Sequence, residues 1–158
     1  SAGLEVEVEG GSGILRGSAS WTWLDTEVTD AGFDEGPGAG FVAGEPLLRR
    51  PEHSWSAQLT VDAGSRTEIF GDLTVVGSRA DRDFTQFPAV PVELPRYSDL
   101  ALGASIEVAV AEAGRPGFVV ELRAENVLDQ DFEQVFGFLS PGRALYVKGT
   151  LTFGGERR

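Results

Sequence analysis

The sequence predicts an all-β fold: an antiparallel up-and-down meander of about seven long strands, forming a segment of a larger transmembrane β-barrel. Three observations support this. Polar and apolar residues alternate along seven segments, the joints between these segments are alternately short and long, and aromatic residues fall at two levels of the apolar side. Consecutive antiparallel strands end at opposite sides of a sheet, so all short joints should lie at one end and all long joints at the other.

Each predicted strand has an apolar side and a polar side, because residues two apart on a strand point to the same face. The predicted strands are Leu4–Glu9, Ile14–Thr26, Ser54–Val61, Thr67–Ser78, Asp99–Val108, Phe118–Glu125 and Ala144–Phe153. Residues predicted to face lipid are Leu59, Val61, Leu73, Leu100, Leu102, Ile106, Val120, Leu122, Val147 and Leu151. Phe70 is an exception, an apolar residue on the polar side.

The polar side is mainly acidic. Glu5, Glu7, Glu9, Glu68, Asp72, Glu107, Glu121 and Glu125 outnumber Arg16, Arg123 and Lys148. In a wide barrel this side would be the lumen, where these groups would be in water or in contact with a plug. A solvated face of a soluble protein gives the same pattern.

The joints differ strongly in length. The short ones are Gly10–Gly13, Ala63–Ser65 and Val110–Gly117, and the long ones are Val28–Glu52, Ala80–Arg96 and Asp129–Arg143. The acid-rich and Gly-rich stretch Asp30–Gly44 and the Pro-rich stretch Phe87–Pro95 are typical of surface loops.

The aromatic residues give an independent indication. Trp21, Trp23, Trp55 and Tyr97 fall at the long-loop ends of their strands, whereas Phe118 and Phe153 fall at the short-turn ends. Two aromatic levels separated by aliphatic residues are typical of membrane interfaces. Several segments also reach the ~9–11 residues that cross a bilayer, whereas strands of soluble proteins are usually about 5–6 residues long.

Two alternatives remain at this point. One is a soluble β-sandwich that serves as a binding or adhesion module of a secreted protein, since it shares the alternation and the strand count. The other is a small free-standing barrel with a structural role, which the odd number of strands disfavours because such bacterial barrels have an even number.

Length, net charge and composition argue against several classes of function. At 158 residues the chain is expected to be one domain, residues 1–158, and its net charge of −12 argues against nucleic-acid binding. It has no cysteine, and His53 is its only histidine, so neither a metal centre nor a nucleophile–base pair is expected. We expect no enzyme and no cofactor. The chain does not begin with Met, so Ser1 is interpreted as a mature terminus or the edge of a truncated chain.

Four segments in a fixed order carry a resemblance to a known family. They read WTWLDTE from Trp21, LRRPEH from Leu48, RAENVLDQDFE from Arg123, and PGR from Pro141 with a terminal strand that ends at Leu151, Thr152 and Phe153. In this set the chain resembles the C-terminal portion of a TonB-dependent outer-membrane receptor of the cobalamin and siderophore type.

The resemblance implies the last seven strands and three outside loops of a barrel of about 22 strands that contains a plug. It implies a place in the bacterial outer membrane and the import of a scarce small-molecule ligand such as a siderophore or cobalamin. Implied partners are outer-membrane lipid, the plug, TonB acting through that plug, and the barrel-assembly machinery. Strands upstream of Ser1 are expected, because the first predicted strand begins at the long-loop end.

The outside loops are where the family implies ligand contact. Candidate ligand-side residues are Phe33, Phe41, Arg49, Arg82, Phe84 and Phe136. Arg49 has a simpler interpretation as part of the start of the third strand, where Pro51 ends the loop. The family usually ends on its terminal aromatic residue, whereas Gly154–Arg158 follow Phe153 here, which bears on recognition by the assembly machinery.

Overall fold

The structure is a computed structural model that describes residues 1–33, 36, 38–112 and 114–153. These residues form one seven-stranded sheet and two two-stranded hairpins. The strand order in the large sheet is β1-β2-β3-β4-β7-β8-β11, and every neighbouring pair is antiparallel. Within the described residues, no helix is long and apolar enough to cross a membrane. The predicted all-β meander of seven strands is therefore confirmed.

The observed strands agree with the predicted ones to within a few residues at each end: for example, β1, β3 and β7 are longer than predicted, and β2 is shorter. The large sheet contains β1 (Ala2–Ser12), β2 (Leu15–Asp25), β3 (His53–Asp62), β4 (Thr67–Val76), β7 (Tyr97–Ala109), β8 (Gly117–Glu125) and β11 (Ala144–Thr152). The hairpins are β5 (Arg79–Asp83) with β6 (Val90–Leu94), and β9 (Glu133–Val135) with β10 (Phe138–Leu139). The last predicted strand end, Phe153, lies just outside β11.

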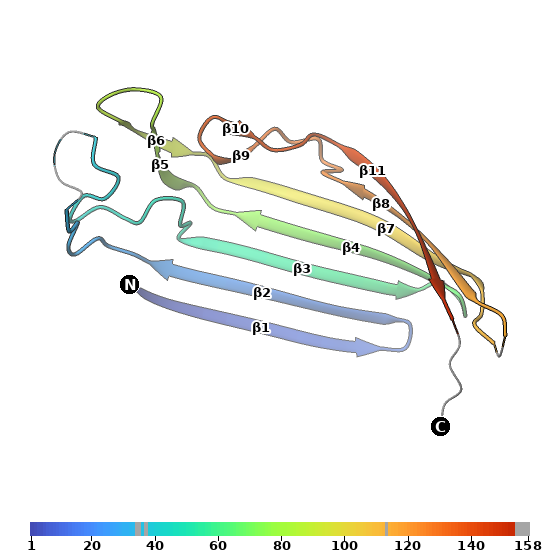
Figure 1. The fold of residues 1–158 in the computed structure, drawn as a ribbon. Helices are drawn as coiled ribbons and strands as arrows, with labels where there is room; N and C mark the ends of the chain where they lie inside the picture. Colours follow the sequence, from blue (N-terminus) through green and yellow to red (C-terminus); the bar gives the residue numbers. More distant parts are fainter. Residues whose placement is uncertain (34–35, 37, 113, 154–158) are drawn as a thin grey trace.

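The connections alternate in length as the sequence predicts. Figure 1 shows the tight turns β1–β2, β3–β4 and β7–β8 at one end of the sheet and the long connections at the other. Only Gly13 and Ile14 join β1 to β2, and Gly13 has a φ of 60°. A two-residue hairpin turn needs a positive φ at its first position, where glycine has no Cβ to oppose it.

The pairing register puts the apolar residues of the seven strands on one face. Trp21 lies opposite Trp55, and Leu73 lies opposite both Ala57 and Leu100. Phe70, the exception on the polar side, lies opposite Thr60 and Gly103. Its ring occupies the space above Gly103, where a Cβ would come within 2.3 Å of the ring. A glycine beneath an aromatic side chain is a known way to seat a large ring on a sheet.

Two of the long joints are more ordered than the sequence predicts. The hairpin β5–β6 begins at Arg79 and otherwise lies within Ala80–Arg96, and the hairpin β9–β10 lies within Asp129–Arg143. The prediction that Phe87–Pro95 is wholly surface loop is wrong, because β6 runs through it and Leu94 is buried. Charged residues and prolines are rare in central strands, so the alternation rule does not detect these short pieces.

The buried residues do not lie on the apolar face of the sheet. The buried apolar residues are Val28, Ala39, Leu94, Tyr97, Ala101 and Phe132, most of them in or beside the long connections. Leu59 and Leu151, both in the set predicted to face lipid, are 53% and 59% exposed. Among the described residues, no second sheet covers this face, and β1 and β11 each pair along one edge only. This is a single open layer, unlike a sandwich or a closed small barrel.

Candidate functional site

The three long connections fold together at one end of the sheet. We call the described residues of 26–52, 77–96 and 126–143 the loop layer, and Figure 1 shows them gathered beyond the ends of the strands. Backbone hydrogen bonds support the first connection, such as Val28 N to Glu45 O at 2.9 Å. Further bonds link it to the second, including Arg49 N to Ala80 O at 2.8 Å. The layer is a folded unit.

Asp81 joins all three connections. It is 1% exposed, and its Oδ1 accepts hydrogen bonds from the Arg82 amide at 2.9 Å and from Arg49 Nε at 3.0 Å. Its Oδ2 accepts one from the Phe136 amide at 2.8 Å. Burial alone would raise the pKa of Asp81, but these hydrogen bonds outweigh it and hold the pKa below the usual aspartate value. Asp81 is therefore a charged carboxylate at the centre of the layer.

Arg79 forms a second buried contact between connections. Its guanidinium donates to the backbone oxygens of Glu133 and Pro95, and it lies 5.1 Å from the centroid of the Tyr97 ring. Tyr97 in turn stacks on Phe132 with a centroid distance of 4.1 Å. An arginine stacked on an aromatic ring in a buried setting adds a favourable cation–π interaction.

This placement corrects the prediction that Tyr97 belongs to the interface aromatics. Tyr97 is 9% exposed, and the register puts it opposite Val76. Val76 in turn lies opposite Ser54, on the polar side of the sheet. Tyr97 was assigned by its height along the strand alone, whereas its alternation parity is opposite to that of Leu100 and Leu102.

Arg82 also departs from its predicted role as a ligand-side residue. It is 6% exposed, and its Nη2 atom lies 2.8 Å from Glu45 Oε2. A buried arginine paired with a carboxylate of another connection holds the layer together and presents no charge at the surface.

The loop layer contains an apolar hollow. It has a volume of about 490 Å³ and is lined by Gly40, Phe41, Leu47, Leu48, Arg49, Arg50 and Phe84. We call it the loop hollow. Three of the predicted ligand-side residues, Phe41, Arg49 and Phe84, meet in it although they come from two different connections. Leu47, Leu48 and Arg50 join them; Leu48 and Arg50 belong to the LRRPEH segment that carries the resemblance, but none of the three is among the predicted ligand-side residues.

The other two predicted ligand-side residues do not line the loop hollow. Phe33 is fully exposed, and Phe136 is 36% exposed with its amide bound to Asp81. Phe136 thus contributes its backbone to the central contact of the layer.

The three tryptophans lie together on the apolar face near the loop layer. The Trp21 ring lies 5.5 Å from that of Trp55 and 5.9 Å from that of His53. Trp23 Nε1 donates to Glu52 Oε1 at 3.2 Å, which ties the cluster to the long connection before β3. Phe118 lies opposite Leu151 near the short-turn end. A role of these residues, or of Phe153, at a membrane interface stays a prediction.

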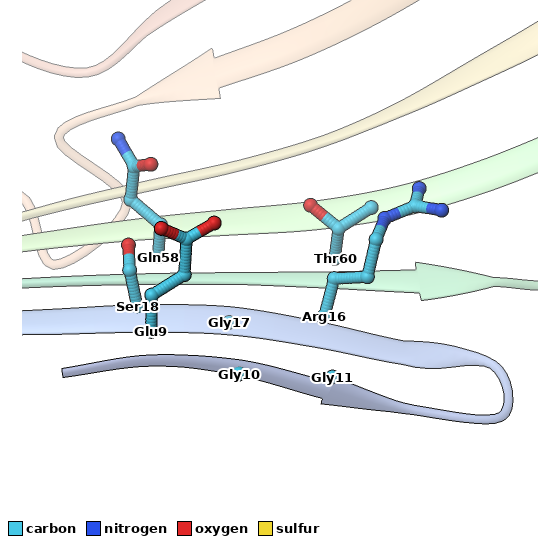
Figure 2. Close-up of a pocket in the computed structure, with 8 residues that line it drawn as sticks. All are labelled: Glu9, Gly10, Gly11, Arg16, Gly17, Ser18, Gln58 and Thr60. Atoms are coloured by element: carbon cyan, nitrogen blue, oxygen red, sulfur yellow. The ribbon is translucent and has the colours of Figure 1, made fainter.

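The polar face carries cross-strand ion pairs. Arg16 pairs with Asp62 at 3.0 Å, Arg123 pairs with Asp72 at 2.7 Å, and Lys148 lies 3.5 Å from Glu121. Figure 2 shows Glu9, Arg16, Ser18, Gln58 and Thr60 projecting from this face around a hollow of about 540 Å³ with glycines 10, 11 and 17 in its floor. The few basic residues are each shared with acidic neighbours, so this face is a mixed polar surface.

The chain is similar in structure to known outer-membrane receptors, although no family model matches it. One is the ferripyoverdine receptor of the outer membrane of Pseudomonas aeruginosa bound to ferripyoverdine, with a TM-score of 0.65, 14% identity, and coverage of 94% of this chain and 19% of that chain. Another is the FpvAI–pyocin S2 complex, with a TM-score of 0.64, 15% identity, and coverage of 94% and 18%. A third, P. aeruginosa FpvA bound to a heterologous pyoverdine and iron, has a TM-score of 0.63, 14% identity, and coverage of 94% and 19%.

These similarities identify the fold. This chain spans about a fifth of the length of the receptors it matches. The seven-stranded meander has the fold of a segment of a TonB-dependent receptor barrel.

Proposed function

We propose that this chain is a barrel-wall and outer-loop segment of an outer-membrane receptor that imports a scarce small-molecule ligand. In this proposal the sheet is part of the wall, and the loop layer is part of the surface that captures the ligand. A plug inside the barrel, moved by TonB, would supply the transport step, and the barrel-assembly machinery would insert the chain. The chain itself would catalyse no reaction.

The observation that carries the proposal is the exposure of the apolar face. Leu102 and Leu122 are each 45% exposed, in the middle of strands that are paired on both sides. A soluble sheet of this size would cover such a face with a second layer, because a large exposed apolar surface is unfavourable in water. Lipid would cover the same face in a barrel wall, and its aromatic residues near the strand ends suit the membrane interface.

The loop layer supports the capture role. It lies at one end of the sheet, where a barrel of this kind has its outside loops. Buried polar contacts around Asp81 hold its three connections in place, so the loop hollow is pre-formed. Pre-formed concave sites cost less ordering entropy when a ligand binds.

Surface labelling of intact cells tests the orientation. The chain has no cysteine, so a single introduced cysteine marks one place in it. With other cysteines of the parent protein replaced, Phe84→Cys in the loop layer should react with a membrane-impermeant maleimide in intact cells. Ser65→Cys, in the β3–β4 turn, should react only after the outer membrane is permeabilised. Equal labelling of both in intact cells would contradict an outer-membrane wall.

Uptake measurements test the import role. A strain without the parent protein should lose uptake of one member of a panel made of radiolabelled ferric hydroxamate, catecholate and pyoverdine chelates and cobalamin. Excision of Gly36–Gly44 should reduce that uptake and leave the heat-modified gel shift of the barrel intact, because the described residues of this segment contribute no strand to the sheet. Unchanged uptake of every probe in the deletion strain would rule out import of these ligands.

A further inference from the structure

The loop hollow differs from the rest of the chain in its charge. The chain has 25 acidic and 13 basic residues, yet the residues that line the loop hollow include two arginines and no acidic residue. Its remaining walls are phenylalanine, leucine and glycine. An apolar site with positive charge in an otherwise acidic protein favours a negatively charged occupant.

Arg49 is held in place by its backbone as well as its side chain. Its φ of 62° lies in the left-handed region, which is costly for a residue with a long side chain. The hydrogen bond from the Arg49 backbone amide to Ala80 O and the hydrogen bond from Arg49 Nε to Asp81 fix it there. Only Nε faces Asp81, and the two Nη groups have no hydrogen-bond acceptor among the described residues. These Nη groups remain available to a ligand.

Arg50 carries a second charge that the described residues leave without a partner. It is exposed and forms no hydrogen bond or ion pair with any of them. It stands between the loop hollow and a smaller hollow of about 290 Å³ that Glu52 and Glu93 also line. Neither carboxylate lies within ion-pair distance of it. The guanidinium of Arg50 is thus free to turn toward an anion in the loop hollow.

We propose that the loop hollow binds a soluble anionic ligand with a flat apolar or aromatic group, its anion held by Arg49 and Arg50 and its apolar part against Phe41, Phe84 and Leu48. This rests on the proposed function and names the ligand class of the capture surface. Guanidinium groups suit carboxylates because they donate two parallel hydrogen bonds. Those bonds are stronger beside apolar walls than in open water.

The apolar walls argue for more than a bare anion. Phe84 is 57% exposed and Phe41 is 47% exposed at the rim, so both rings offer surface to a ligand. Covering them removes apolar area from water, which a fully hydrated ion such as phosphate does not do. A carboxylate on an aromatic ring satisfies both halves of the site.

The probes for the test are 4-(trifluoromethyl)benzoate and its neutral amide. Their binding to the full-length protein in nanodiscs is followed by fluorine NMR, with empty nanodiscs as the background. The benzoate should bind at least about ten-fold more tightly than the amide, because each charge-assisted hydrogen bond favours the anion. Inorganic phosphate alone at the same concentration should not displace it.

Matched variants locate the binding. Arg50→Gln should weaken benzoate binding about ten-fold and amide binding less than about two-fold. Arg50→Lys should restore part of the loss, since it keeps the charge but not the planar fork. Phe84→Ala should weaken both probes about five-fold. Arg96→Gln and Phe87→Ala change exposed residues of the connection that carries Phe84, residues that do not line the loop hollow, and should affect neither probe.

Three results would overturn the inference. They are equal binding of the two probes, equal effects of Arg50→Gln and Arg96→Gln, and displacement of the benzoate by added lipopolysaccharide, which would assign the site to a lipid. The test is independent of the cell experiments above. If the benzoate does not bind but surface labelling and uptake give the expected results, only the ligand class is wrong. If the benzoate binds but the protein does not lie in the outer membrane, only the proposed function is wrong.

Discussion

The sheet and the loop layer bury their residues in opposite ways. In the sheet, large apolar side chains such as Leu102 and Val147 remain exposed on one face. In the loop layer, the buried polar set consists of Arg79, Asp81, Arg82, Asp83 and Asn126, and the second largest fully buried side chain is a carboxylate. An ordinary soluble domain has apolar residues inside and charges outside. Here the apolar side chains are exposed on one face of the sheet, and charged side chains are buried within the loop layer.

The difference indicates which surroundings each region is built for. The sheet satisfies its backbone through strand pairing and leaves its apolar face to the environment, which suits hydrocarbon. The loop layer pairs its buried charges internally, through contacts such as Asp81 with Phe136 and Arg82 with Glu45, although Arg82 Nε itself has no hydrogen-bond partner among the described residues. A polar network of this kind is rigid and keeps its shape in water. The two regions should therefore respond to different perturbations.

The largest expected effect is in the sheet. Leu102→Arg should lower the free energy of unfolding in lipid vesicles by about 2–4 kcal/mol, as for a charge placed at mid-bilayer on a barrel exterior. Ser105→Arg, on the polar face opposite Glu68 and Glu121, is the control and should cost far less. Urea titrations of both variants measure the difference. Equal costs would show that the two faces of the sheet do not differ in their surroundings.

The next effect is in the loop layer. Asp81→Asn replaces one of two accepting oxygens by a donor, although both oxygens accept hydrogen bonds. At least one buried donor then loses its partner, which costs about 1–3 kcal/mol of local opening. Hydrogen exchange of the Phe136 amide reports this opening.

The control for Asp81 is another aspartate–arginine pair of the same layer. Asp129 and Arg143 are both more than half exposed. Asp129→Asn should therefore leave local opening nearly unchanged, because exposed ion pairs contribute little to stability. If both variants open the layer equally, burial of Asp81 is not what holds the three connections together.

The sheet could be predicted from the sequence, because its strands follow one rule over many residues. Alternation in segments such as Asp99–Val108 identified all seven strands and both faces, including Phe70 as the exception. The short and long joints then fixed the up-and-down order. Tyr97 was assigned to the wrong face because its position along the strand was used in place of the alternation of side chains. The alternation determines the face to which a strand residue points.

The loop layer could not be predicted in the same way. Its structure depends on contacts between residues 30 to 55 positions apart, such as Arg49 with Asp81 and Asp81 with Phe136. No periodic pattern marks such pairs, and charged residues in a Pro-rich region normally indicate solvent. Phe41, Arg49 and Phe84 were selected as loop residues of suitable chemistry, and only the tertiary structure shows that they share one hollow.

An effect similar in size to that of Asp81→Asn is expected where the sheet has packing of its own. In Gly103→Ala the new Cβ would lie 2.3 Å from Phe70 Cζ and 2.7 Å from the backbone oxygen of Leu122. Because a backbone atom cannot move aside easily, overpacking should cost about 1–3 kcal/mol. Gly10→Ala is the control, since nothing lies within 4 Å of its Cβ position. A neutral Gly103→Ala would show that the Phe70 ring moves freely on this face.

Acid should open the loop layer no further than Asp81→Asn does, with the sheet unchanged. The pKa of Asp81 is lowered in the folded layer, as is the pKa of Asp129 through its hydrogen bond with Arg143. A carboxylate whose pKa is lower in the folded layer than in the opened one stabilises the folded layer. This stabilisation is complete when the pH is above the pKa of the opened form, which is about 4. It is lost as the pH falls through the lower pKa of the folded form.

The layer should therefore stay closed at neutral pH and open progressively below about pH 4. The NMR signal of the Phe136 amide in nanodiscs should report a titration in that range for the native chain and for Asp129→Asn. The Asp81→Asn variant has no carboxylate to protonate at this position, so the Phe136 signal of this variant should show no titration step. At every pH its degree of opening should match that of the native chain at low pH. A step centred above about pH 5, or one that survives Asp81→Asn, would mean that another group controls the closure. The charge buried in the loop layer would then not be what distinguishes its stability from that of the sheet.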